Sequence, residues 1–285
     1  MRQLTGKVVV ITGAGGGIGR ALAQRFAAAG AVLALSDVDP AAARETARQA
    51  CGEDGARCYA LDVTDRDAVA EHARQVRSDL GPANVMINNA GVAAIGDLVD
   101  LSWQQLDWIH GINVNGVLHG TRAFLPELVD SGDGHLVNIS SLFGLLGVPA
   151  QSAYCAGKAY VRALTESVRQ EMRVAGHRVG ATVVHPGFVR TDFVRSGQAA
   201  GDGDAAALGD VVDRWVRTTP EQVADKVVRA VRKDRGRVLV GADAYLGDAL
   251  ARLSPVGYQA LTSALTRSMK RTSDAENTGG ERQSA

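Results

Sequence analysis

A glycine-rich turn between an apolar run and a helix-like stretch constrains this chain more than any other feature. Residues 12–19 read Thr-Gly-Ala-Gly-Gly-Gly-Ile-Gly, directly after the apolar residues 8–11 and before the helix-like residues 20–27. Glycines at such a turn let backbone N–H groups approach a pyrophosphate, and the following helix presents its positive end to the same phosphates. The pattern predicts a dinucleotide site, although a flexible surface turn or a methyltransferase loop could read similarly.

A carboxylate after the next strand-like run narrows the choice of cofactor. Asp37 follows residues 32–36 and lies eighteen positions beyond Gly19, close to the spacing of an acid that binds the adenosine ribose. A 2′-phosphate would meet like charge there, and residues 38–40 hold no Arg or Lys. The sequence favours NAD over NADP, with a turn or helix-start acid as the alternative for Asp37. A P-loop is disfavoured because Arg20 and Ala21 follow Gly19.

Strand-like and helix-like segments alternate from the N-terminus, and this alternation predicts the fold class. We expect an α/β domain with a doubly wound, Rossmann-type parallel sheet of about seven strands, flanked by helices on both faces. One domain over residues 1–245 accommodates all of these segments. The strands are expected at residues 8–12, 32–36, 57–61, 85–88, 135–140, 180–185 and 238–241.

The C-terminal third contains three segments of different character. A small, polar, glycine-rich stretch at residues 196–205 predicts a substrate lid near residues 192–218. Residues 246–271 carry apolar positions near helical spacing, which predicts two short amphipathic helices. Packing on the domain or on a second subunit is favoured for them over a membrane-surface role. Residues 272–285 are rich in Ser, Thr, Gly and charge, which predicts a disordered tail.

Charge and cysteine content bear on partners and compartment. Acidic and basic residues balance at 31 each, so no net basic field favours a nucleic-acid partner. The chain shows neither an apolar signal segment nor a run long enough to span a bilayer, and we expect a cytoplasmic protein. Cys51, Cys58 and Cys155, like the six histidines, lack metal-ligand spacing, which predicts reduced thiols and no metal site.

Tyr154 and Lys158 place a phenol and an ammonium four residues apart, on one face of the helix predicted over residues 153–171. Lowering a tyrosine pKa from ~10 to ~7 takes about 4 kcal/mol, roughly what one charge at ~4 Å supplies at an effective dielectric constant of ~20. The pair therefore predicts a tyrosine acid/base, although such a pair is common by chance on exposed helices. Cys155 between them is read as a small buried side chain.

With their neighbours, these motifs resemble the short-chain dehydrogenase/reductase family, in its single-domain subgroup, over most of residues 5–241. The glycine turn fits the family's TGxxxGxG loop, and residues 88–91 fit the NNAG motif that stabilises the central sheet. Residues 186–191 fit the PGxxxT segment that reaches the nicotinamide carboxamide through the Val189 backbone and the Thr191 hydroxyl. The resemblance implies cofactor contacts at Gly13, Gly17, Ile18, Gly19, Asp37, Asp62, Val63, Asn89, Ala90, Gly91, Tyr154, Lys158, Pro186, Val189 and Thr191.

The resemblance also implies four catalytic residues and a metal-independent hydride transfer. Asn113 matches the helix asparagine that holds a water in a proton relay toward Lys158, and Ser141 matches the substrate-orienting serine. Tyr154 is then the general acid or base, and Lys158 keeps it acidic and contacts the nicotinamide ribose. Ser140, beside Ser141, is read as a packing or hydrogen-bonding residue of the strand.

Apolar residues around these positions predict the substrate's character. With no basic cluster beside them to bind a phosphate, we expect an apolar secondary alcohol or its ketone. Trp215 is expected to line or anchor the lid. The family resemblance implies a homodimer or homotetramer through the helices at residues 101–129 and 152–174, with Trp103, Trp108 and Phe124 as candidate contacts. The expected pocket residues are Leu142, Phe143, Leu145, Leu146, Val148, Phe188, Phe193 and Val194.

The leading interpretation is therefore an NAD-dependent alcohol or ketone oxidoreductase. Three alternatives stay open on the sequence. A catalytically silent dinucleotide sensor or scaffold would keep the fold, a methyltransferase could share the loop and acid, and a sugar-nucleotide epimerase belongs to the wider superfamily. The set of Asn113, Ser141, Tyr154 and Lys158 disfavours the silent scaffold and is unexplained by a methyltransferase.

Overall fold

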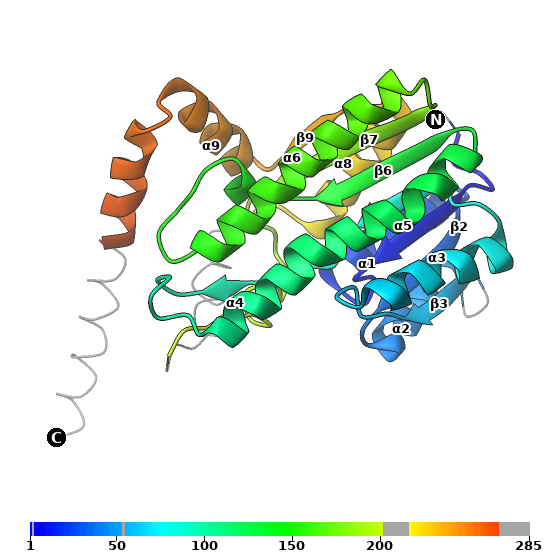
Figure 1. Cartoon of the computed structure of the whole chain (residues 1–285), viewed down its shortest axis with the longest axis horizontal. Helices are drawn as coiled ribbons and strands as arrows, with labels where there is room; N and C mark the ends of the chain where they lie inside the picture. The colour runs from blue at the N-terminus through cyan, green and yellow to red at the C-terminus, as the bar shows by residue number, and fades with distance from the viewer. Residues whose placement is uncertain (2, 53–54, 202–216, 268–285) are drawn as a thin grey trace.

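Seven parallel strands form one sheet in the order β3-β2-β1-β4-β6-β7-β9 (Figure 1). We analyse a computed structural model that describes residues 1, 3–52, 55–201 and 217–267. Each strand expected from the sequence is present, with ends that agree to within one residue. The strands are β1 (Val8–Thr12), β2 (Val32–Asp37), β3 (Ala56–Ala60), β4 (Val85–Asn88), β6 (Gly134–Ile139), β7 (Val179–Pro186) and β9 (Arg237–Val240).

Helices cover both faces of the sheet, which makes this a doubly wound, Rossmann-type domain. Helices α1, α2 and α8 pack on one face, whereas α3, α5 and α6 pack on the other, toward the viewer in Figure 1. All residues of β1, β4 and β6 are buried, as expected for strands covered on both sides. The helices are α1 (Gly17–Ala28), α2 (Pro40–Cys51), α3 (Arg66–Leu80), α4 (Trp103–His110), α5 (Val117–Asp130), α6 (Ser152–Val174), α8 (Pro220–Lys233) and α9 (Ala242–Leu253).

A π-helical turn and a two-stranded ladder are among the local elements that the sequence does not predict. The π-helical turn η1 (Gly111–Gly116) joins α4 to α5 and interrupts what reads as one long helical segment. The second is a two-stranded parallel ladder in which β5 (Ala94–Ile95) pairs with β8 (Gln198–Ala199). Neither leaves a sequence signal, because a π-turn differs from an α-turn by one extra residue and two-residue strands have no periodicity to detect.

One predicted contact residue lies in the core instead. Phe124 was a candidate for a subunit surface, but its side chain is fully buried between α5 and the sheet, beside Leu128 and Met86. Trp103, another candidate subunit contact, is 81% exposed at the start of α4 and is therefore accessible on the surface. Phe124 is buried because it lies on the face of α5 that packs against the sheet.

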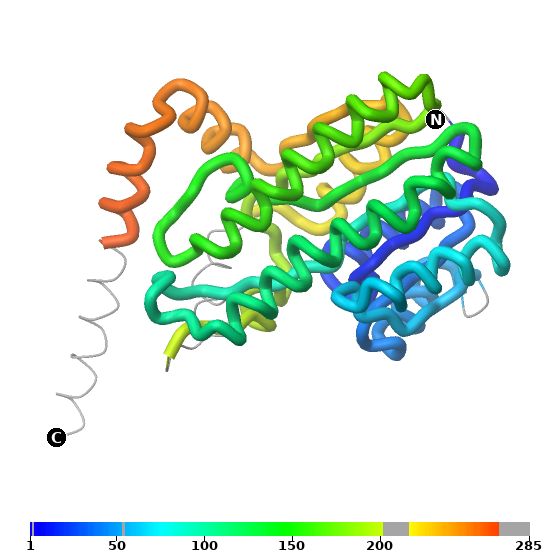
Figure 2. Tube along the Cα trace, viewed as in Figure 1, coloured from blue at the N-terminus to red at the C-terminus, as the bar shows by residue number. Residues whose placement is uncertain are grey.

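The C-terminal helices extend from one end of the domain (Figure 2). Helix α9 and the helical residues 257–267 cover most of the segment predicted to be helical. The helix at 257–267 contacts the loop after β6, where the Gly147 N–H donates to Tyr258 Oη at 3.0 Å. Residues 202–216, including Trp215 and most of the predicted lid, and the predicted tail lie outside the described residues. In the part of the chain that is described, no helix is long and apolar enough to cross a bilayer.

Candidate active site

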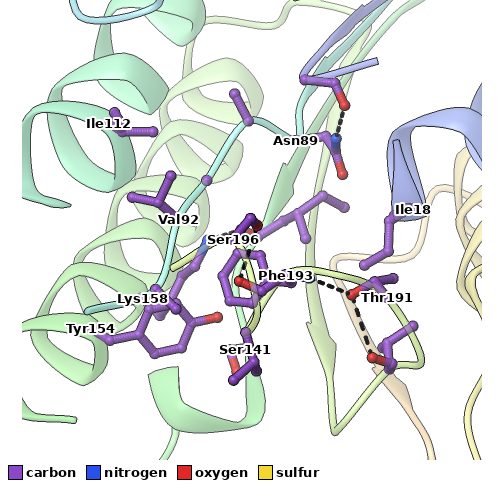
Figure 3. Close-up of a pocket in the computed structure, with 18 of the residues that line it drawn as sticks. Ile18, Asn89, Val92, Ile112, Ser141, Tyr154, Lys158, Thr191, Phe193 and Ser196 are labelled. Atoms are coloured by element: carbon purple, nitrogen blue, oxygen red, sulfur yellow. Dashed lines mark hydrogen bonds between the residues drawn. The ribbon is translucent and has the colours of Figure 1, made fainter. Parts of the chain in front are cut away.

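The carboxyl ends of six neighbouring strands open onto one cleft of about 830 Å³. The cleft lies where the strand order reverses between β1 and β4, which is the position where ligands bind in open parallel sheets. In Figure 3, Asn89, Ile18 and Thr191 lie toward one end, while Tyr154, Lys158 and Ser141 gather at the other. The sequence-predicted residues that line the cleft are Gly13, Gly17, Ile18, Asp37, Asp62, Val63, Asn89, Ala90, Gly91, Ser141, Tyr154, Lys158, Pro186, Val189 and Thr191.

Backbone atoms of the glycine turn form part of the cleft wall, at Gly13, Gly16 and Gly17. Gly13 has a φ of 62°, and a Cβ there would lie 2.7 Å from the Cα of Ala90. Gly19 is not a lining residue; a Cβ on it would overlap the Gly13 carbonyl, so Gly19 lets α1 pack against the turn. Helix α1 begins after Gly16 with neither a side-chain cap nor an acid in its first turn. Its N–H groups and positive dipole end therefore suit a pyrophosphate.

Asp37 lies at the end of β2, beside the glycine turn. Its carboxylate accepts hydrogen bonds from Gly15 N at 2.8 Å and from Asp39 N at 3.0 Å, which fixes the acid at the cleft. Arg20 donates through Nη2 to the Gly15 carbonyl at 2.7 Å and does not line the cleft. Among the described lining residues, Lys158 is the only Lys or Arg. A second acid, Asp62, accepts from the N–H and hydroxyl of Thr64, each at 2.8 Å.

Asparagines tie the cleft floor to the sheet. Asn89 donates through Nδ2 to the carbonyls of Thr12 and Gly13 at 3.0 and 2.9 Å, which holds the glycine turn against the end of β4. Asn88 donates to Asn138 Oδ1 at 2.8 Å, and Asn138 in turn donates to Thr165 Oγ1 at 2.9 Å. This buried network links β4, β6 and α6. These hydrogen bonds explain why amide side chains are tolerated at adjacent positions 88 and 89, because both amides are hydrogen-bonded.

Asn113 lies in the π-helical turn η1 and is fully buried. Its side-chain amide makes two hydrogen bonds with the backbone of Val92. Oδ1 accepts from Val92 N at 2.9 Å, and Nδ2 donates to Val92 O at 2.8 Å. It is not a cleft-lining residue. A Cβ on Gly91 would lie 3.1 Å from Asn113 Oδ1 and 3.3 Å from Lys158 Nζ, so both groups border the same glycine. The turn thus brings Asn113 near Lys158, behind the cleft wall.

Tyr154, Lys158 and Ser141 converge at the far end of the cleft (Figure 3). Tyr154 and Lys158 share one face of α6, with Lys158 Nζ 5.6 Å from the centroid of the phenol ring. The ammonium donates to the Ile139 carbonyl at 3.1 Å. Ser141 follows β6, hydrogen-bonds Tyr154, and accepts the Phe143 N–H at 3.1 Å. Neighbouring Ser140 instead donates to the Lys158 carbonyl at 2.7 Å, which anchors α6 on the sheet.

Burial dominates the electrostatics of this end. It lowers the pKa of Lys158 to about 8 and raises the pKa of Tyr154 above its ordinary value, while the hydrogen bond from Ser141 acts in the opposite direction. Spacing predicts that Lys158, helped by an oxidised nicotinamide, makes Tyr154 acidic, and burial opposes this effect in this structure. A phenolate there is desolvated, because Tyr154 is only 8% exposed.

Aromatic side chains surround the phenol. Phe143 meets the Tyr154 ring edge-on at 6.3 Å and the Phe188 ring at 5.7 Å, and Phe193 lies 5.9 Å from Tyr154. Leu142 and Val194 line the same cleft. Three residues expected there do not line it, namely Leu145, Leu146 and Val148. The chain turns after Phe143, so that Leu142 and Leu146 both approach Gly247 of α9.

Sequence reasoning missed several lining residues. Trp108 was read as a packing or subunit-contact residue, yet it lines the cleft and packs beside Phe193 in the cluster around Tyr154. Gln151 adds a polar side chain to the wall, and its position three residues before Tyr154 is the sequence signal that points to it. Ser196 adds another, in the segment that the sequence predicts to be the lid. Among the described residues, no group of three or more His, Cys, Asp or Glu side chains is placed to hold a metal ion.

Comparisons with known proteins agree with this architecture. A sequence model of the short chain dehydrogenases matches residues 7–201. SadH of Mycobacterium tuberculosis, named as an oxidoreductase, is 45% identical over 267 residues, which are 93% of this chain and 96% of SadH.

Solved structures point the same way. A short chain dehydrogenase/reductase from Burkholderia phymatum in complex with NAD has a TM-score of 0.82 at 31% identity, covering 91% of this chain and 97% of that one. A metagenomic short-chain oxidoreductase in complex with NADP has a TM-score of 0.68 at 31% identity, covering 83% and 97%. Similar proteins thus bind one or the other nicotinamide dinucleotide.

Proposed function

Because the chain belongs to the short-chain dehydrogenase/reductase family of oxidoreductases, we propose that it interconverts an apolar secondary alcohol and its ketone with NAD. The observation that carries the proposal is the convergence of Ser141, Tyr154 and Lys158 at one end of a cleft whose other end suits a dinucleotide. A catalytically silent scaffold has no need of buried Tyr154 and Lys158 side chains at such a position.

The chain's own residues divide the work of proton transfer. Ser141 is to hold the substrate oxygen: its Oγ accepts the Phe143 N–H, and the hydroxyl proton that it shares with Tyr154 in this structure turns to the substrate oxygen when substrate is bound. Tyr154 removes the alcohol proton in oxidation and returns it in reduction. Lys158, with its pKa lowered to about 8, supplies positive charge behind the phenol and a proton route past Asn113. A bound nicotinamide supplies or accepts the hydride.

The cofactor preference rests on Asp37. We expect this carboxylate, held by Gly15 N and Asp39 N, to accept two ribose hydroxyls and to repel a 2′-phosphate. Arg20, the nearest basic candidate in the turn, is engaged by the Gly15 carbonyl and by Thr46. Residues of the turn and of the strand ends would hold the dinucleotide, with Gly17 and Ile18 at the pyrophosphate, Asp62 and Val63 beside adenine, and Val189 and Thr191 at the carboxamide.

The substrate class rests on the aromatic wall. Phe143 and Phe193 lie against the phenol ring and Phe188 lies against Phe143, and each substrate methylene buried against these rings contributes about 0.8 kcal/mol. With Lys158 the only described basic side chain lining the cleft, a phosphorylated substrate lacks a second partner. A bulky apolar alcohol or ketone suits these walls better than ethanol, acetone or a charged hydroxy acid.

Assembly and compartment complete the proposal. We propose a homodimer or homotetramer, supported by exposed apolar side chains on the helices of one face, among them Trp103, Leu118 and Tyr160. A cytoplasmic setting is supported by three free cysteines, Cys51, Cys58 and Cys155.

A kinetic panel tests the proposed function. Secondary alcohols and ketones of increasing apolar size are assayed with NAD(H) and NADP(H) by nicotinamide absorbance. We expect catalytic efficiency to rise at least about tenfold from the smallest to the bulkiest apolar substrates. A flat or falling trend would contradict the apolar pocket. Absence of turnover with every substrate would favour the silent scaffold, and turnover confined to nucleotide sugars would favour an epimerase.

A further inference from the structure

A fully buried histidine lies directly behind Ser141. His185 is the penultimate residue of β7, and its Nδ1 lies 2.8 Å from the Ser141 carbonyl oxygen. A carbonyl oxygen can only accept a hydrogen bond, so Nδ1 carries the proton. The imidazole stays neutral because burial, aided by Arg237 and Arg162, lowers the pKa of His185 to about 4, against the opposing effects of the hydrogen bond to the Ser141 carbonyl and of Asp248. The ring is therefore fixed in its Nδ1–H tautomer.

The other ring nitrogen makes this histidine costly for the fold. His185 Nε2 is buried without a hydrogen-bond partner. An unpaired buried polar atom costs roughly 1–3 kcal/mol, and an aliphatic side chain at the same site of a parallel strand would avoid that cost. Stability of the sheet alone gives no reason for an imidazole here. What the imidazole adds is a hydrogen bond to Ser141.

Ser141 is consequently held at two atoms. Its hydroxyl oxygen accepts the Phe143 N–H at 3.1 Å, and its carbonyl accepts both His185 Nδ1 and the Gly144 N–H, the latter at 3.0 Å. The Gly144 bond belongs to the short helical turn that Ser141 itself caps. The His185 bond instead ties Ser141 to β7, the strand that leads into the Pro186–Thr191 segment of the cofactor side.

We propose that His185 is a positioning residue: by holding the Ser141 carbonyl, it aims the Ser141 hydroxyl at the substrate oxygen beside Tyr154. The inference rests on the proposed function, in which Ser141 binds that oxygen. It predicts that His185 acts on the chemical step and leaves cofactor binding alone, because its contact is with Ser141 and not with the glycine turn.

Two substitutions separate the hydrogen bond from the volume of the side chain. His185→Leu removes the donor, whereas in His185→Asn the amide Nδ2 occupies nearly the place of Nδ1 and can donate. We expect the leucine variant to lower kcat about tenfold with the KM for NAD(H) within twofold, and the asparagine variant to recover kcat to within about threefold of wild type. The leucine variant should fold, because Gly144 N still satisfies the Ser141 carbonyl.

A matched control variant and a double-mutant cycle test whether the effect of His185 on kcat passes through Ser141. His135 is another fully buried sheet histidine, bonded to Thr182 Oγ1 at 2.7 Å and outside the cleft lining, so His135→Leu should leave kcat unchanged. In a Ser141→Ala background, His185→Leu should cause no further loss of kcat. Losses that multiply, or a leucine variant as active as wild type, would overturn the inference while the proposed function stands.

A readout without turnover keeps the two proposals distinguishable. The Phe143 amide donates to Ser141 Oγ, so its hydrogen exchange reports how firmly the hydroxyl is held. We expect exchange of this amide to accelerate about tenfold in His185→Leu and to stay near the wild-type rate in His185→Asn and His135→Leu. If the wild type turned over no substrate, the proposed function would fail, and an unchanged Phe143 exchange rate in His185→Leu would still overturn the positioning role.

Discussion

At the glycine-turn end of the cleft the wall is mostly backbone, whereas at the Tyr154 end it is mostly side chain. Gly13 and Gly17 bring N–H groups to the surface, and Asn89 holds the turn by its carbonyls. At the other end, Phe143 and Phe193 pack around a nearly buried phenol. The first end suits a ligand whose phosphates need N–H donors, and the second suits one whose carbon skeleton needs a dry wall.

The two ends also differ in their electrostatics. Asp37 is only partly buried and is held by two backbone N–H groups. Lys158 and Tyr154 are buried. Desolvation lowers the pKa of Lys158 and raises the pKa of Tyr154, and both shifts favour the neutral side chain. The proposed binding and proton-transfer roles therefore fall at opposite ends of one cleft, so a substitution at one end should leave the other end working. Four experiments probe that separation, in order of decreasing effect.

Tyr154→Phe should have the largest effect. Loss of the phenolic hydroxyl removes the proton donor and acceptor, and we expect kcat to fall at least about a thousandfold with the Kd for NADH within threefold. Tyr160→Phe is the matched control, because Tyr160 lies on the same helix and is 36% exposed. Steady-state kinetics and fluorescence titration of NADH measure the two quantities. Retention of most activity in Tyr154→Phe would remove the phenol from the mechanism.

Gly13→Ala should damage the opposite end. The new Cβ would lie 2.7 Å from the Cα of Ala90 at a φ of 62°, so the turn must shift and we expect the Kd for NADH to rise about a hundredfold. In Gly52→Ala the φ is 82° with open space around the Cβ, which isolates backbone strain from the clash. If both variants bound NADH like the wild type, the turn would not be the phosphate site.

Asp37→Ser tests cofactor choice within the same end. Removing the carboxylate abolishes its repulsion of a 2′-phosphate and one or two ribose hydrogen bonds, so we expect the NAD-to-NADP ratio of kcat/KM to fall about tenfold. Asp39→Ser is the control, because Asp39 caps α2 and does not line the cleft. A wild-type protein faster at limiting NADP than at limiting NAD would refute the role given to Asp37.

His72→Leu should leave both ends unchanged and affect stability alone. His72 is buried between the rings of Tyr59 and Phe124, and neither ring nitrogen has a partner. Leucine removes the unpaired polar atoms, and we expect the free energy of unfolding to rise by about 1 kcal/mol at pH 7.

Acid should widen that difference. Burial lowers the pKa of His72 to about 4, below its usual ~6.5, so the unfolded chain binds the proton first and the wild type loses stability as pH falls from 6.5 toward 4. Urea unfolding at pH 7 and pH 5 measures the gain, with exposed His177→Leu as control. Equal stability at both pH values would contradict the buried, neutral state of His72.

The sheet and the family were predictable because they depend on patterns with strong physical constraints. Apolar runs such as residues 8–11 and 85–87 have no stable place outside a covered parallel strand, and each was found within one residue of its expected position. A glycine-rich turn between a buried strand and a helix is typical of a dinucleotide site. The expected short-chain dehydrogenase/reductase family is confirmed by the match to residues 7–201.

The substrate end was less predictable, for reasons that lie in loops and in tertiary contacts. Nothing local indicates that the chain turns after Phe143, taking Leu146 toward α9 and away from the cleft. Trp108 lines the cleft because of how α4 lies beside α6, a relation between distant segments. The desolvation of Tyr154 likewise depends on side chains brought together by the fold, among them Phe143 and Phe193, so the spacing of Tyr154 and Lys158 does not reveal it.

The hydrogen bond between Gly147 and Tyr258 joins positions 111 residues apart in the chain. Together with the packing of Leu142 and Leu146 against Gly247, it lets the C-terminal helices shape the loop that begins at Ser141. Inherited variation in those helices can thus alter the shape of the cleft wall while the side chains of Tyr154 and Lys158 on α6 stay unchanged. New substrates can be acquired in small steps, each tested by selection without first losing the chemistry.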